Sequence, residues 1–83
     1  MELTGYYMTA VTKFADGIKT IIVFGVRTRE ELVKALHAAH PDEEYKLCKF
    51  SREKFSLEME VDELADPGYL ADRLGIPQVD EVF

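Results

Sequence analysis

The chain has 83 residues, 47% of them hydrophobic, and a formal net charge of −6. This length predicts a single domain over residues 1–83 with one modest core, and the hydrophobic content excludes a disordered chain. No apolar run approaches the ~20 residues of a membrane helix, and the first residues lack the basic and apolar segments of a secretory signal. The single cysteine, Cys48, cannot form an internal disulfide, so we expect a cytoplasmic protein.

Segment 6–26 predicts a β-hairpin. Two runs rich in β-branched and aromatic residues flank Asp16-Gly17, a pair that favours a type I′ turn and sets Ala15 opposite Ile18. Both faces of this hairpin are largely apolar. We expect one face to join the core, and it carries Val11, Ile22, Phe24 and Val26. The other face needs a second cover, from the C-terminal segment, a second copy or another protein; it carries Met8, Phe14, Ile21 and Val23.

A helix and two strands are predicted after the hairpin. Thr28 and Glu31 form a capping box, apolar residues recur at helical spacing, and Pro41 closes a helix over Arg29–Ala39. Residues 45–50 and 55–61 predict two strands of a second hairpin, separated by the polar break 51–54. A helix over 53–63 is the competing interpretation, because its residue types favour helices, but alternation with period two favours a strand.

A short C-terminal helix is predicted to begin at Asp66-Pro67 and to end at Gly75. The tail that follows either joins a sheet edge or covers the outer face of the hairpin. The element order is therefore ββαββα. It predicts an α+β fold in which a four-stranded antiparallel sheet carries one main helix on one face, with a short C-terminal helix.

Negative charge is concentrated in the C-terminal half. Residues 1–40 contain five basic and four acidic residues, a net of +1, whereas residues 41–83 contain five basic and twelve acidic residues, a net of −7. Such a surface repels nucleic acid and attracts basic proteins, although acidity also keeps a small protein soluble. The densest carboxylates are candidate partner-binding residues, with no calcium-loop spacing: Glu58, Glu60, Asp62, Glu63 and Asp66.

Two histidines and the cysteine are the other candidates for chemistry. His37 and His40, three residues apart on the predicted helix, could share a metal with Cys48 or Asp42, and Cys48 with His37 could act as nucleophile and base. Neither set matches a known ligand or catalytic motif. Partly exposed histidines near a helix C-terminus and a small cysteine in the core explain them more simply. We therefore expect no metal, no cofactor and no enzymatic activity.

Residues 6–20, YYMTAVTKFADGIKT, resemble the start of small phage and prophage proteins of anaerobic Gram-positive bacteria. In size, acidity and mixed α/β build the chain is also similar to anti-CRISPR proteins and related phage inhibitors. The resemblance implies a compact inhibitor that acts by binding in the cytoplasm of the infected bacterium. We hypothesise that the acidic surface replaces nucleic acid in a basic site of a host defence protein. The alternatives are a homodimer through the outer hairpin face and a small metal protein or enzyme using His37, His40 and Cys48.

Overall fold

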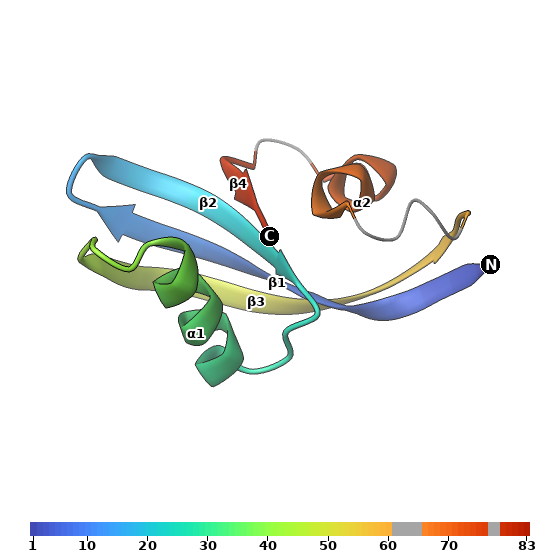
Figure 1. Ribbon diagram of the computed structural model, residues 1–83, viewed down its shortest axis with the longest axis horizontal. Coiled ribbons are helices and arrows are strands. Elements are labelled where there is room, and N and C mark those ends of the chain that lie inside the picture. Colours follow the sequence, from blue (N-terminus) through green and yellow to red (C-terminus); the bar gives the residue numbers. More distant parts are fainter. Residues whose placement is uncertain (61–65, 77–78) are drawn as a thin grey trace.

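The computed structural model describes residues 1–60, 66–76 and 79–83. Figure 1 shows its described elements, a sheet with α-helices packed beside it. In chain order they are β1 (Glu2–Phe14), β2 (Gly17–Phe24), α1 (Arg29–Ala39), β3 (Tyr45–Glu58), α2 (Pro67–Arg73) and β4 (Glu81–Val82). The strand order across the sheet is β3-β1-β2-β4. The two longest strands, β1 and β3, therefore lie side by side.

The predicted α+β class is confirmed, but the sheet is mixed and not purely antiparallel. β1 pairs antiparallel with both β2 and β3, whereas β4 runs parallel to β2. The predicted order ββαββα is also wrong, because the described elements follow the order ββαβαβ. The tail supplies the fourth strand: after β3, the chain passes through α2 and ends at the opposite edge of the sheet (Figure 1).

A single 14-residue strand, β3, replaces the predicted second hairpin. It pairs with β1 along nearly the whole length of both strands. Residues 51–54, predicted as a break, contain no Gly, Pro, Asn or Asp to form a turn, so the chain continues along β1. The ladder shifts between Val11, which pairs with Lys49, and Thr12, which pairs with Leu47. Cys48 is the extra residue of this β-bulge.

The predicted β1–β2 hairpin is confirmed, with its register moved by two residues. Phe14 pairs with Gly17, so the turn is Ala15-Asp16 and not Asp16-Gly17. Gly17 begins β2 with φ +142°, a backbone conformation that favours glycine. Since side chains alternate with period two, a shift of two residues leaves each one on its predicted face.

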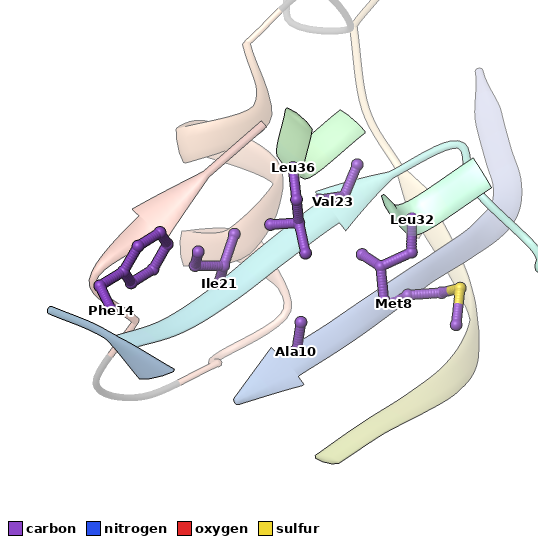
Figure 2. Packing of buried hydrophobic residues seen from close by; sticks show 7 residues of the cluster. All are labelled: Met8, Ala10, Phe14, Ile21, Val23, Leu32 and Leu36. Carbon is purple, nitrogen blue, oxygen red and sulfur yellow. The ribbon is translucent and has the colours of Figure 1, made fainter. Parts of the chain in front are cut away.

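Helix α1 covers the hairpin face that the sequence predicted to be the outer one. Leu32 and Leu36 of α1 are fully buried against it, as Figure 2 shows. The core cluster comprises Met8, Ala10, Phe14, Ile21, Val23, Leu32 and Leu36. The prediction that this face needs a cover beyond the main helix is therefore wrong. Both faces are apolar, so the pattern alone could not indicate which one the helix would choose.

Both helices begin as predicted. The Thr28 hydroxyl accepts a hydrogen bond from the N–H of Glu31 over 3.2 Å, and the Asp66 carboxylate accepts one from the N–H of Gly68 over 3.0 Å. Gly75, with φ +68°, follows the end of α2. These local signals place the helices correctly because capping needs only side chains close in sequence.

The second face of the hairpin is covered at one end by α2. Figure 1 shows α2 on the side of the hairpin opposite α1. Ile22, on this face, is fully buried, and Leu70 and Ala71 of α2 are 5 and 6% exposed. Three aromatic rings lie on the same face with centroids 5.3 to 6.1 Å apart: Tyr7, Phe24 and Phe55. The chain therefore covers both faces of the hairpin with its own residues, each over a different part.

Candidate functional site

The four apolar residues predicted to bind a partner are core residues. Met8, Phe14, Ile21 and Val23 are 0 to 3% exposed beneath α1. A partner could reach them only if α1 left the sheet, which would expose the whole cluster to water. The predicted homodimer contact through this face is therefore wrong, and any interaction surface of the chain lies elsewhere.

The predicted acidic cluster is divided among different structural roles. Glu58 is exposed at the end of β3, where its carboxylate lies 3.0 Å from the backbone amine of Met1. Asp66 caps α2, and Glu60 is exposed. Asp62 and Glu63 lie outside the described residues. The partner-binding role of these carboxylates stays a prediction, supported by the exposure of Glu58, Glu60 and Asp66.

The structure does not bring His37, His40 and Cys48 together. His37 is exposed on α1, and Cys48 is exposed at the bulge instead of buried in the core. Over residues 1–60, 66–76 and 79–83, no group of three His, Cys, Asp or Glu side chains is placed to hold a metal. The three residues therefore have separate surroundings, and His40 is distinguished by its side-chain contacts.

His40 joins the end of α1 to the C-terminal strand. Its Nε2 lies 2.6 Å from Oε1 of Glu81 in β4, and its Nδ1 lies 3.0 Å from Oε1 of Glu43. Lys19 of β2 donates to the other Glu81 oxygen over 3.3 Å. The Phe14 ring packs against the imidazole at a centroid distance of 4.8 Å. This network, which we call the His40 network, ties β4 to both β2 and α1.

Opposite charges in the His40 network stabilise each other. Hydrogen bonds to Glu81 and then to Glu43 raise the pKa of His40. The hydrogen bond to Glu81 likewise raises the pKa of Lys19. Burial alone would raise the pKa of Glu81, but the hydrogen bonds from His40 and Lys19 outweigh burial and lower it. The arrangement therefore favours a charged Glu81 carboxylate between two cations. These contacts help to hold the short strand β4 against the sheet.

The outer edge of β3 has no such attachment. β3 is the terminal strand of the sheet, and in the described part of the chain it pairs with β1 alone. Every residue from 48 to 54 is exposed, and Phe50 keeps 45% of its surface in contact with solvent. An open strand edge presents unpaired N–H and C=O groups that can pair with another strand.

Alternate residues of β3 turn their backbone groups toward this open edge. The N–H of Met59 donates to the carbonyl of Met1 over 2.8 Å, so odd-numbered residues bond to β1 as far as the bulge. Arg73 of α2 supports this parity, because its Nη2 donates over 3.0 Å to the outward carbonyl of Glu58. The backbone groups that face outward beyond this contact belong to Phe50, Arg52, Lys54 and Ser56.

Basic side chains surround Tyr6 beside the open edge. The guanidinium carbons of Arg27 and Arg52 lie 4.9 and 5.5 Å from the centre of the Tyr6 ring. Lys54 is the cross-strand neighbour of Tyr6. Residues 46–54 contain four basic residues and one acidic residue, Glu53. The open stretch is thus locally basic, although it belongs to the half of the chain with a net charge of −7.

Three features of the site were missed in the sequence. The prediction of a loop at 51–54 concealed the edge, although the lack of Gly, Pro, Asn and Asp there was a usable signal. The contacts of Lys19 and Glu81 with His40 join residues far apart in sequence, and no local pattern announces them. Charge counted over a whole half of the chain also concealed the basic stretch.

Comparisons of the chain with protein-family models, curated proteins and solved structures found no match. Among the described residues, no helix is both long and apolar enough to span a membrane. The function of the chain is therefore inferred from its own geometry, and above all from the edge of β3.

Proposed function

We propose that this chain is a non-enzymatic protein-binding module that adds an extended segment of its partner to the edge of β3. The observation that carries the proposal is the exposed stretch 48–54, whose outward backbone groups belong to alternate residues of a terminal strand. Strand addition of this kind obtains affinity from main-chain hydrogen bonds and specificity from alternate side chains.

The side chains of the edge support recognition of a particular segment. Phe50 offers an exposed apolar surface on one face of the sheet, beside Arg52 and the Tyr6 ring. Lys49 and Glu53 offer opposite charges on the other face. A partner strand therefore meets apolar, aromatic and charged groups in a fixed order, which favours some sequences over others.

A proline at the outward position tests this function. Arg52→Pro removes an outward N–H without removing a bond to β1, and Arg52→Ala keeps the N–H while removing the same side chain. Linear peptides selected from a random library on the wild-type protein should still bind the Arg52→Ala protein, with the loss due to the side chain alone. They should bind the Arg52→Pro protein about tenfold more weakly than the Arg52→Ala protein or worse, as fluorescence anisotropy would measure. Equal binding to both variants would contradict strand addition.

The second candidate is the acidic inhibitor that the sequence suggested. Glu58 and Glu60 are exposed, and the resemblance to phage proteins supports an acidic surface that occupies a basic nucleic-acid-binding site of a host defence protein. Charge reversal with Glu58→Lys and Glu60→Lys should abolish inhibition of such a target while leaving the circular dichroism spectrum unchanged. Retained inhibition by the reversed protein would reject this candidate.

A further inference from the structure

We propose that the occupant of the β3 edge is a second copy of this chain, paired antiparallel about a two-fold axis at Ser51. The proposal rests on the function proposed above and names its partner. It uses a surface on the opposite side of β1 from β2 and leaves the core beneath α1 intact. Joining the two terminal strands would extend the sheet continuously from one copy into the other.

Backbone geometry restricts where the axis can lie. In an antiparallel pair, hydrogen bonds form only where both residues turn their N–H and C=O toward the partner strand. On β3 these are the even-numbered residues, so even must pair with even. An axis midway between two residues would pair even with odd and is excluded. The axis must therefore lie at a residue position, and the exposed stretch offers only a few.

The charges of the edge select Ser51 among these positions. An axis at Ser51 places Lys49 opposite Glu53 of the second copy, and symmetry repeats this pair. An axis at Arg52 or at Glu53 would place that residue opposite its own copy, with like charges facing each other. An axis at Phe50 would leave both Lys49 and Glu53 without an opposite charge directly across. The Ser51 register is thus the one in this stretch that opposes unlike charges.

The same register gives Phe50 a partner. It places Phe50 opposite Arg52 of the second copy, and these two residues have outward backbone groups that can exchange hydrogen bonds. Their side chains lie on one face, where an exposed phenylalanine ring and a guanidinium can form a cation–π contact. Ser51 faces its own copy as a non-hydrogen-bonded pair, in which the side chains approach most closely. Each exposed residue from 49 to 53 therefore acquires a suitable neighbour.

The charges that this register would pair have no ion-pair partner among the described residues of one copy. Neither Lys49 nor Glu53 takes part in an ion pair among the described residues. Lysine on an edge strand ordinarily discourages pairing. Here its effect depends on register, because Lys49 meets a carboxylate in the Ser51 register alone. The charges therefore act to specify one pairing and to oppose the others.

Both helices leave room for the second copy. α1 packs beside Tyr45 and Leu47, before the exposed stretch begins. α2 reaches the edge at Glu58 through Arg73, after the stretch has ended. The contact is short and smaller than a standard protein interface, so we expect the dimer to dissociate with a constant in the micromolar range.

Disulfide trapping tests the register directly. In a Cys48→Ser background, Ser51→Cys places two thiols across the axis, where the Cα separation of a non-hydrogen-bonded pair is about 4.5 Å and allows a disulfide. Ser56→Cys is the matched control, because residue 56 lies five residues from the axis and is therefore far from its own copy in this register. Oxidised Ser51→Cys protein should form covalent dimer at least about tenfold faster than the control. Equal rates would overturn the register.

Sedimentation equilibrium provides an independent measurement. Lys49→Glu and Glu53→Lys alone should each weaken dimerisation about tenfold, because each places like charges opposite each other twice. The double variant restores opposite charges and should recover the wild-type constant. A wild-type protein that stays monomeric at about 100 µM, or a double variant no better than the singles, overturns the proposal.

The Arg52→Pro variant separates this proposal from the function on which it rests. If the wild-type protein is monomeric but binds library peptides that Arg52→Pro rejects, strand addition stands and self-pairing fails. If a dimer forms and Arg52→Pro leaves it unchanged, the edge is not the contact and self-pairing again fails. Both variants lose the Arg52 side chain and its contact with Phe50 of the second copy, so any further loss of dimer in Arg52→Pro relative to Arg52→Ala reports the outward N–H. A dimer that is weakened in Arg52→Ala and lost in Arg52→Pro supports both proposals.

Discussion

The two edges of the sheet are treated in opposite ways. At the β2 edge, the tail adds β4, and the N–H groups of Phe24 and Phe83 donate over 2.8 Å to the carbonyls of Phe83 and Ile22. The His40 network then fixes Glu81 from two directions. At the β3 edge, seven consecutive residues, 48–54, are exposed and pair outward with none of the described strands.

This difference shows which edge of the sheet the chain covers with a strand of its own and which edge it leaves open. The β2 edge consists of buried apolar residues, Ile21, Ile22 and Val23. Leaving this edge without β4 would expose the core to water. The β3 edge is polar and can remain in water when unpaired. The chain closes the edge that would destabilise it and leaves open the one whose backbone groups can bind a partner.

The largest expected effect is a difference in stability between proline substitutions at two neighbouring residues of β3. Glu53→Pro removes an N–H that bonds to β1, so it should lower the free energy of unfolding by about 2 to 4 kcal/mol. Arg52→Pro removes an outward N–H and should cost less than about 1 kcal/mol. Urea denaturation of the two variants measures the difference. Similar losses would mean that the backbone parity of β3 is wrong.

The next effect concerns the closed edge. Removing residues 81–83 deletes β4 and the backbone bonds of Phe83 to Phe24 and Ile22, and should lower the free energy of unfolding by about 1 to 3 kcal/mol. The N–H of Phe24 would lose its acceptor, so its hydrogen exchange should accelerate. Exchange at Arg52 should stay the same and serves as the internal control. Unchanged protection of Phe24 would show that β4 does not close this edge.

A smaller effect is expected midway between the edges. Thr12 is 0% exposed in β1, and among the described residues its hydroxyl has no hydrogen-bond partner. Thr12→Val replaces this hydroxyl with a methyl group of similar shape and should raise the free energy of unfolding by about 1 kcal/mol. Thermal denaturation measures the gain, and a loss of stability would reveal a partner for the hydroxyl. Neither edge should respond to this substitution.

The smallest effect is a pH dependence confined to the closed edge. Because its hydrogen bonds raise the pKa of His40 in the folded protein, its contribution is complete below the unfolded value of about 6.5 and is lost as pH rises through the folded pKa. Glu81 acts in the opposite sense, since its lowered pKa gives stability that is lost as pH falls below 4.5. Hydrogen exchange at Phe24 should therefore increase above neutral pH beyond the intrinsic rate, and His40→Gln should abolish that excess. An excess that persists in His40→Gln would exclude His40 as its source.

Features coded by neighbouring residues were predictable from the sequence. The capping box of Thr28 and Glu31 and the Asp66-Pro67 start placed both helices, because each signal acts within one turn. The hairpin was equally local, and its two-residue register error left every side chain on its predicted face. The strand at 45–58 was divided wrongly because its continuity depends on β1, far away in the chain.

The candidate site depended more on long-range contacts and was less predictable. Whether α1 would cover Val23 or Phe24 could not follow from the sequence, because both faces of the hairpin are largely apolar. β4 could be foreseen only as one option for the tail, since its pairing is fixed by the contacts of Glu81 with Lys19 and His40. The open edge followed from strand order, which one sequence does not encode in any local pattern.

Helices α1 and α2 cover opposite faces of the sheet (Figure 1), and no residue of the cluster beneath α1 comes from α2. Loss of α2 would leave that cluster intact, so the molecule contains two units that can open at different free energies. The smaller unit is α2 with the residues packed against it, and it should open first. Its backbone would then be exposed to proteases while the rest of the molecule stays folded. The lifetime of the protein in a cell would then depend on this minor unit more than on its global stability.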